Sequence, residues 1–330
     1  MPKHTRYTAV LSGALLLLFF SFLLSLRYGS TYLTTKEFFD AIFGHTGKEN
    51  ATLILTAIRL PRALAALFAG AGLALSGTLL QLVTDNSLAA PNILGINAGA
   101  GFFVILTLSL FPNLSPLLPL AAFLGAMLTA LLILLVSTRF AKGKGAVVLC
   151  GVALSALFGA GISFFSVLDA DVLATYTDFS VGGFRGVGMS ELYAPILIIS
   201  LCLVLALLLG GRLQLFCLGD TLATSLGVRV RRVRLLALIL AAASAAAAVC
   251  FAGLLGFVGL IVPHVSRRLA RHNVRLELLL SPLGGASLLL LADLAGRVLF
   301  APSEIPVGIF TALLGVPFFL TLVLRRNRYA

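Results

Sequence analysis

Long apolar stretches, broken by short polar segments, run along the whole chain. A helix that crosses a bilayer needs roughly 17–25 predominantly apolar residues, and all but one of the stretches reach that length. The exception, Gly253–Val262, directly follows another apolar stretch. The pattern predicts an all-α membrane protein of about ten transmembrane helices, in one domain over residues 1–330. The expected spans are Val10–Leu26, Leu64–Val83, Ile93–Phe111, Leu117–Val136, Ala146–Leu168, Leu192–Leu209, Leu235–Phe251, Gly253–Val262, Leu278–Leu294 and Ile305–Leu324.

Basic residues indicate how these spans are oriented. Cytoplasmic loops carry an excess of lysine and arginine. If Leu235–Val262 were one long span, the arginines of 267–275 would fall outside, so we predict a break near Gly253 that returns the chain to the cytoplasm. Both chain ends are then cytoplasmic, and most of the 24 lysines and arginines lie inside. The inner segments are Lys3–Arg6, Arg139–Lys144, Arg212–Arg234, Arg267–Arg275 and Arg325–Arg328.

The composition excludes several function classes. Hydrophobic residues make up 60% of the chain and charged residues 11%, so most of it must lie in lipid. The net charge of +12 is assigned to cytoplasmic loops, and no nucleic-acid partner is expected. The four cysteines lack CxxC spacing, so we interpret them as packing residues and predict no metal site. HExxH, GxSxG and P-loop motifs are absent, so we expect no enzyme activity and no ATP site on this chain.

One acid, Asp293, lies inside a predicted span. An intramembrane carboxylate is a functional candidate by default, because it is costly to insert. Arg297 lies four residues on, one helical turn away, and a structural ion pair is the simpler interpretation. An ion-coupled secondary transporter that uses Asp293 is the alternative, although such proteins usually need more than one intramembrane ionisable group.

The stretch LGDTLATSLGVRVRR, residues 218–232, is polar and basic between two apolar runs. Asp220 can cap the N-terminus of a helix that begins at Thr221. Leu222 and Leu226 share one face of that helix, and Gly227 can end it in a left-handed conformation. A helix of about two turns is marginal in water. It must either pack on its own bundle or dock onto a cytoplasmic partner.

Several long motifs follow one another along the chain. They are RLPRALAALFAGAGLALSGTLLQ (59–81), NSLAAPNILGINAGA (86–100), LGDTLATSLGV (218–228), GFVGLIVPHVSRRL (256–269), LLLLADLAGR (288–297) and EIPVGIFTALLGVPFFL (304–320). With these motifs the chain resembles the FecCD-type permeases of bacterial ABC importers for iron–siderophores, haem and vitamin B12, and the resemblance covers nearly its whole length. One departure is the loop that usually reads NPLADP and reads NSLAAP here.

The resemblance implies a particular assembly in the bacterial cytoplasmic membrane. Two permease copies, expected to be identical, would pair with two ATP-binding-cassette ATPases, and those partners would carry the ATP and Mg. An extracytoplasmic binding protein would deliver the cargo. A ferric siderophore is the first expectation for the cargo, then haem, then cobalamin.

The resemblance also assigns roles to residues. The loop of about 210–234 would hold an ATPase-coupling helix, the segment of about 168–190 an outer gate, and Arg59, Arg62 and Arg297 would grip acidic residues of the binding protein. Arg59 and Arg62 lie three apart, which places them on one helix face suited to a carboxylate. Snorkelling to the interface is the alternative. The coupling residues are Asp220, Thr221, Leu222, Leu226 and Gly227, and the cytoplasmic gate residues are Asn86, Leu88, Lys144 and Gly145.

Overall fold

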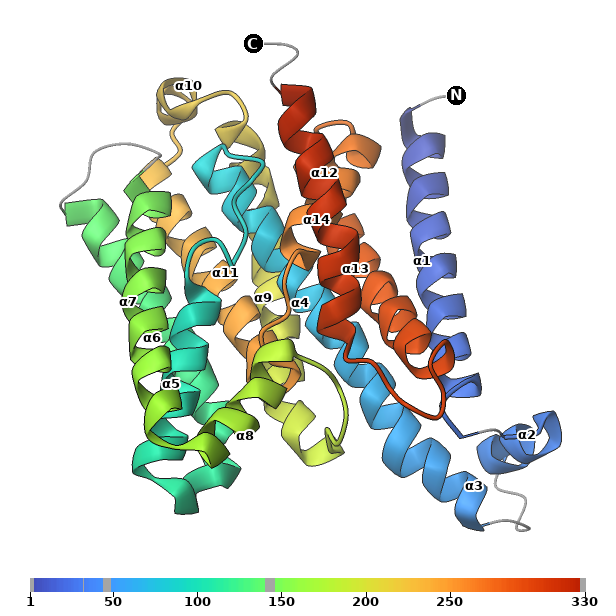
Figure 1. The fold of residues 1–330 in the computed structure, drawn as a ribbon. Helices are drawn as coiled ribbons and strands as arrows, with labels where there is room; N and C mark the ends of the chain where they lie inside the picture. The colour runs from blue at the N-terminus through green and yellow to red at the C-terminus, as the bar shows by residue number, and fades with distance from the viewer. Residues whose placement is uncertain (1–2, 32, 44–48, 140–145, 327–330) are drawn as a thin grey trace.

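A computed structural model describes residues 3–31, 33–43, 49–139 and 146–326. Over these residues it is an all-helical bundle (Figure 1), and a helix occupies each of the ten predicted spans. These helices are α1 (Lys3–Arg27), α4 (Leu60–Thr84), α5 (Ile96–Leu110), α6 (Leu118–Arg139), α7 (Ala146–Leu168), α9 (Met189–Phe216), α11 (Val230–Ala252), α12 (Val258–Ala270), α13 (Val274–Val298) and α14 (Val307–Arg326).

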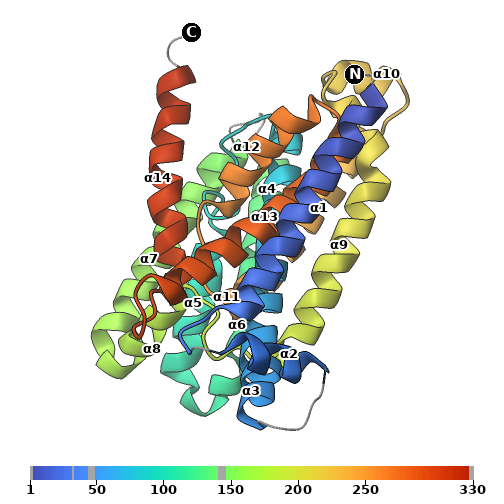
Figure 2. The same ribbon diagram turned by 90° about the vertical axis from the view of Figure 1, so that its right-hand side faces the viewer.

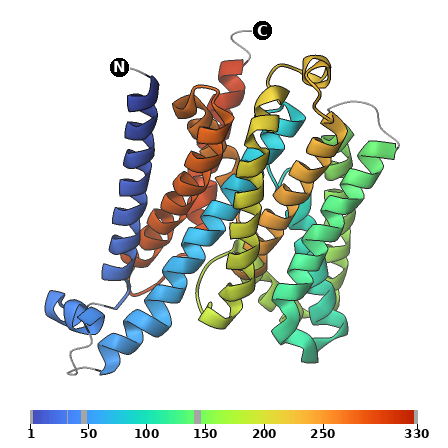
Figure 3. The same cartoon turned by 180° about the vertical axis from the view of Figure 1, so that it is seen from behind.

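The chain alternates direction from helix to helix. The start of α1 and the end of α14 lie at the same end of the bundle as the short helix α10 (Asp220–Ser225) (Figures 1 and 3). This end carries the arginines of 229–234 and 267–271. The positive-inside rule assigns it to the cytoplasm, as the sequence predicts.

The predicted break near Gly253 is present. α11 ends at Ala252, and Gly253 has a φ of +72°. Phe257 is also left-handed, with a φ of +64°, and α12 then runs back toward the end with α10. The backbone of this turn bonds to the outer segment: the Leu254 N–H donates to Phe179 O at 3.2 Å and the Gly183 N–H donates to Ala252 O at 2.9 Å.

α4 lies at the centre and packs against α13, α11, α12 and α9, while α1 lies against α13 at one side (Figure 2). Glycines permit the close contacts of α4. A Cβ on Gly70 would lie 2.1 Å from the Gly285 carbonyl oxygen, and one on Gly77 would lie 1.9 Å from that of Gly259. Small residues at such crossings let helices approach in lipid, where no hydrophobic force drives them together.

Several elements are absent from the sequence predictions. α4 begins earlier than its predicted span, because α3 (Glu49–Leu53) and a π-helical segment, Ile54–Arg59, lead directly into it. The predicted outer gate contains α8 (Ala170–Val181), which is capped by the Asp169 side chain. The remaining unpredicted elements are α2 (Thr35–Phe43) and a 3-10 segment, Pro112–Leu117.

Candidate functional site

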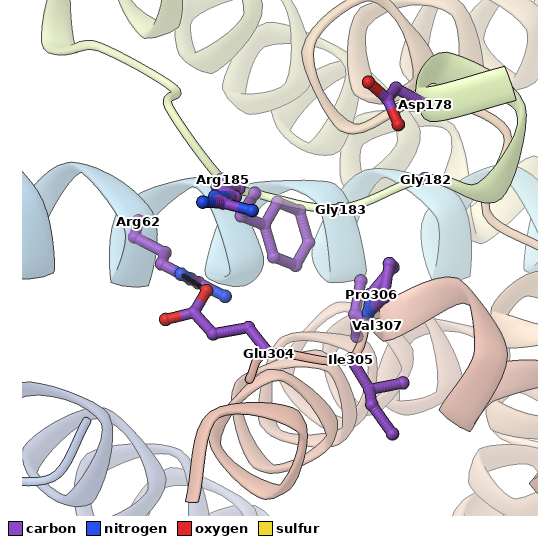
Figure 4. Close-up of a pocket in the computed structure, with 10 residues that line it drawn as sticks. Arg62, Asp178, Gly182, Gly183, Arg185, Glu304, Ile305, Pro306 and Val307 are labelled. Carbon is purple, nitrogen blue, oxygen red and sulfur yellow. Dashed lines mark hydrogen bonds and ion pairs between the residues drawn. The ribbon is translucent and has the colours of Figure 1, made fainter. Parts of the chain in front are cut away.

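At the outer end, Arg62 connects two acids from distant parts of the chain. Its Nη2 donates to Asp293 Oδ1 at 2.9 Å, and its Nη1 donates to Glu304 Oε2 at 2.7 Å. Figure 4 shows Arg62, on α4, reaching toward Glu304, which lies between α13 and α14. The segment that precedes α14 is thereby held against the central helix.

Arg297 lies on the other side of Asp293. Its Nε is 3.0 Å from Asp293 Oδ2, so the ion pair that the four-residue spacing predicts is present. Its Nη2 also donates to Ser25 Oγ at 2.8 Å. Asp293, only 2% exposed, thus faces two guanidinium groups. This arrangement matches a buried structural carboxylate and gives no support to the alternative of an ion-coupled transporter.

Arg59 has a different set of partners. Its Nη1 donates to the carbonyl oxygens of Leu26 and Arg27 at 2.8 and 2.7 Å, and its Nη2 donates to that of Thr31. The last carbonyls of a helix lack partners within the helix and attract cations. Arg59 therefore closes the C-terminal end of α1.

Within the described part of the chain, Arg59 and Arg62 do not share a carboxylate. A buried guanidinium must find acceptors, and the two arginines find different ones, the α1 carbonyls and the two acids. Arg59 is 4% exposed and Arg297 is 3% exposed, so both are covered by the bundle. Of the three predicted docking arginines, Arg62 alone lines the outer pocket described next.

This outer pocket, of about 270 Å³, lies between the segment after α8 and the segment before α14 (Figure 4). Burial raises the pKa of the Glu304 carboxyl, but the hydrogen bond and charge of Arg62 outweigh it, so the pKa lies below its ordinary value. Asp178 and Arg185 add exposed charges at the rim. The pocket is lined by Arg62, Asp178, Gly182, Gly183, Phe184, Arg185, Glu304, Ile305, Pro306 and Val307.

Sequence reasoning did not single out Glu304, Asp178 or Arg185 as site residues. Asp178 and Arg185 fall within the predicted outer gate, and Glu304 opens the EIPVG motif. No local pattern could pair Glu304 with Arg62, because 242 residues separate them.

At the cytoplasmic end, the predicted short helix is present as α10. Gly219 precedes it, and the cap assigned to Asp220 is wrong: no side-chain cap bond forms, and Asp220 is the first helical residue. Its carboxylate is instead held by Arg234, with Nη2 2.8 Å from Oδ2. Gly227 follows the helix with a φ of +83°, the left-handed conformation that the sequence predicts.

α10 is anchored on one face and exposed on the other. Ala223 is fully buried, whereas Leu222 is 56% exposed and Leu226 is 60% exposed. Thr221 is exposed beside them. α10 projects from the cytoplasmic end of the bundle (Figure 1). A short helix that is anchored on one face and exposes two leucines on the other has the form of a docking element.

The predicted gate residues are partly described. Asn86 and Leu88 follow α4 in a turn where Asn86 Oδ1 accepts a bond from the Leu88 N–H at 3.0 Å. Both side chains are half-buried. Lys144 and Gly145 lie outside the described residues.

The sequence model of the FecCD transport family matches residues 16–325. The chain belongs to the FecCD transport family. It is 36% identical to the Fe(3+)-citrate import system permease protein YfmE of Bacillus subtilis (strain 168), over 98% of each chain. It is 40% identical to the hemin transport system permease protein HmuU of Yersinia pestis, over 82% of this chain and 83% of that protein.

A solved structure supports the same assignment. A metal-chelate type ABC transporter, described in an inward-facing conformation, is 32% identical to the permease and superposes with a TM-score of 0.84, covering 96% of this chain and 99% of that one. The protein is thus a multi-pass membrane permease of an ABC importer. It is the non-catalytic component, and nucleotide is bound by the ATPase partner.

Proposed function

We propose that this permease carries an iron chelate across the membrane, a ferric siderophore or haem, and works as two permease copies with two ATPases and an external binding protein. Its relatives include a Fe(3+)-citrate import permease and a hemin transport permease, and these names support this cargo class. Cobalamin is the third candidate.

The observation that carries the proposal is α10. Asp220 fixes the helix to α11 through Arg234, while Leu222 and Leu226 face outward from the cytoplasmic end. Thr221 is the second residue of the helix, and the left-handed Gly227 follows its end. An ATPase that seats these leucines could push the whole α9–α10–α11 unit when it closes on ATP. Nucleotide on the ATPase then shifts the equilibrium between an outward-open and an inward-open state of the bundle.

The remaining site residues have proposed roles in the same cycle. Arg62, beside the exposed Asp178 and Arg185, would meet acidic groups of the binding protein at the outer pocket. Arg59 and Arg297 would act there by holding α1 and Asp293 in place. Asn86 and Leu88, with Lys144 and Gly145, would close the cytoplasmic side.

The test is co-purification of the ATPase with tagged permease, together with uptake of radioactive ferric citrate, ferric hydroxamate and haem by cells that lack their own permease. In the Leu222→Gln plus Leu226→Gln variant we expect loss of both the ATPase and uptake. The matched control is Leu110→Gln plus Leu114→Gln, an exposed leucine pair of the same spacing at the outer end.

The results separate the parts of the proposal. A Leu222/Leu226 variant that retains the ATPase and transports normally would exclude the coupling role of α10. Uptake of none of the three iron chelates by the wild type, with uptake of cobalamin, would exclude the iron cargo while leaving the coupling role intact.

A further inference from the structure

A second pocket, of about 550 Å³, lies at the cytoplasmic end where α9, α10 and α11 meet. Three arginines line it: Arg212 near the end of α9, Arg229 just before α11, and Arg232 in its first turn. The described lining contains no acid. It consists of Arg212, Leu226, Gly227, Val228, Arg229, Arg232, Val233 and Leu236.

These three arginines differ from others at the same end of the bundle. Arg234 is paired with Asp220, and Arg267 is paired with the buried Glu277. In the described part of the chain, Arg212, Arg229 and Arg232 have no acid within ion-pair distance. Three like charges around one cavity repel each other, so the pocket is complementary to an anion.

On both α9 and α11, a stripe of exposed apolar side chains extends from the pocket along one face of the helix. On α9, Leu201, Leu205 and Leu208 are 55%, 38% and 75% exposed. They precede Arg212 at intervals of four, three and four residues, which places all four side chains on one helix face. On α11, Arg232 is followed at the same intervals by Leu236 and Ile239, which are 46% and 36% exposed.

The position of the arginines along their helices corresponds to the headgroup level. The predicted α9 span ends at Leu209, three residues before Arg212, and the predicted α11 span begins at Leu235, three residues after Arg232. A ligand that meets both features needs an anionic head at the arginines and an apolar tail along the stripes. Basic pockets at the cytoplasmic ends of transmembrane helices suit acidic lipid headgroups.

We propose that this pocket binds one anionic phospholipid of the cytoplasmic leaflet. Its phosphate lies among Arg212, Arg229 and Arg232, and its acyl chains follow the leucine stripes of α9 and α11. The same pocket is walled by Leu226, Gly227 and Val228, the residues that end α10. A bound lipid therefore braces the C-terminal end of α10 and makes its position dependent on lipid composition.

The test is native mass spectrometry of the purified full-length permease, titrated with phosphatidylglycerol or with phosphatidylcholine. We expect a phosphatidylglycerol adduct that persists at activation energies that strip phosphatidylcholine. In the Arg212→Gln, Arg229→Gln, Arg232→Gln variant, affinity for phosphatidylglycerol should fall by roughly fivefold for each charge removed. The control is Arg231→Gln, Arg268→Gln, Arg271→Gln, which removes three exposed charges from the same end without touching the pocket.

Two further arms identify the ligand chemistry. Inorganic phosphate and glycerophosphoglycerol, which lack acyl chains, should fail to displace the lipid; displacement by either at equal concentration would overturn the acyl-chain part. Because the three arginines are exposed, the triple variant is expected to fold. If the triple variant fails to fold, the single variants Arg212→Gln and Arg232→Gln replace it, and each should lose part of the affinity for phosphatidylglycerol.

Other occupants of the pocket give different results. Equal loss of phosphatidylglycerol in the pocket and control variants would reduce the effect to net charge and overturn the proposal. If the triple variant binds phosphatidylglycerol normally but no longer co-purifies with the ATPase, the arginines contact the ATPase instead. Unchanged lipid binding with a change in permease oligomer size would assign the pocket to a second copy.

Discussion

At the scale of single residues, the outer end is organised around Asp293. This buried carboxylate faces Arg62 and Arg297, and Arg62 continues to Glu304. Removing one member of a buried ionic group lowers the free energy of unfolding by more than the intact group contributes to it, because the remaining charges are left buried without a partner.

The Asp293→Asn change should therefore destabilise the fold strongly, by about 3–5 kcal/mol. Glu304→Gln should cost less, since the Glu304 side chain is 19% exposed and that of Asp293 is 2% exposed. Thermal unfolding of both variants in the same detergent measures the difference. Equal losses would show that burial of Asp293 does not govern the stability of the cluster.

Glu304 also predicts a pH dependence. Arg62 holds its pKa below the ordinary value despite partial burial. A carboxyl with a lowered folded-state pKa stabilises the fold above its unfolded-state pKa of about 4.3, and this stabilisation is lost as the pH falls through the folded-state value. The melting temperature of the wild type should thus fall over this acidic range more steeply than that of Glu304→Gln. Parallel profiles would contradict the assignment.

Residue contacts were predictable from the sequence only where they are local. Arg297 and Asp293 pair because they are one helical turn apart, and Gly227 is left-handed because it ends a short helix. Asp220 looked like a cap, but Arg234, fourteen residues on, takes its carboxylate. The separate partners of Arg59 and Arg62 depend on which helices lie side by side in the bundle, which no local pattern records.

At the scale of elements, the spans were predictable because lipid demands about 20 apolar residues for each crossing. The break at Gly253 followed from charge, since only a turn there keeps the arginines of 267–275 inside. α2 and α8 escaped prediction because each is short and set within a polar connection. In α8, the Asp169 cap was the available local signal.

The glycine contacts between α4 and α13 make a prediction about helix packing. Gly70→Ala places a Cβ against the Gly285 backbone, where no side chain can yield, so the helices must separate. We expect a loss of about 1–3 kcal/mol in the free energy of unfolding, as in overpacked cores. Gly159→Ala, on α7, is the control, because its Cβ meets nothing within 4 Å.

The control should keep wild-type stability or gain up to about 1 kcal/mol from helix propensity. Denaturant titration of the detergent-solubilised permease compares the two variants. Equal behaviour of Gly70→Ala and Gly159→Ala would mean that α4 and α13 adjust without cost.

At the scale of the whole molecule, the orientation in the membrane can be tested with the native cysteines. Cys217, at the end of α9, is exposed, whereas Cys202 and Cys250 are buried. In a Cys150→Ala background, a membrane-impermeant maleimide should label inverted vesicles and leave right-side-out vesicles unlabelled. Labelling should be lost in Cys217→Ser.

The labelling rate carries a second expectation. Although Cys217 reaches solvent, partial desolvation by its neighbours, and then the charge of Glu277, raise the pKa of its thiol above the ordinary value. Less thiolate is present at neutral pH than in a free cysteine. The rate should keep rising above the pH at which a model thiol has levelled off, and labelling from the opposite side of the membrane would reverse the orientation.

The turn between α11 and α12 has a consequence for biosynthesis. α12 has 13 residues, about 20 Å of helix, too short to cross a bilayer core of about 30 Å alone. α11 and α12 must then enter the membrane together as a hairpin, with the arginines of 267–271 never leaving the cytoplasm. The backbone of this turn forms hydrogen bonds with Phe179 and Gly183. Both residues are synthesised before the turn, so its hydrogen-bond partners are already present when the hairpin enters the membrane.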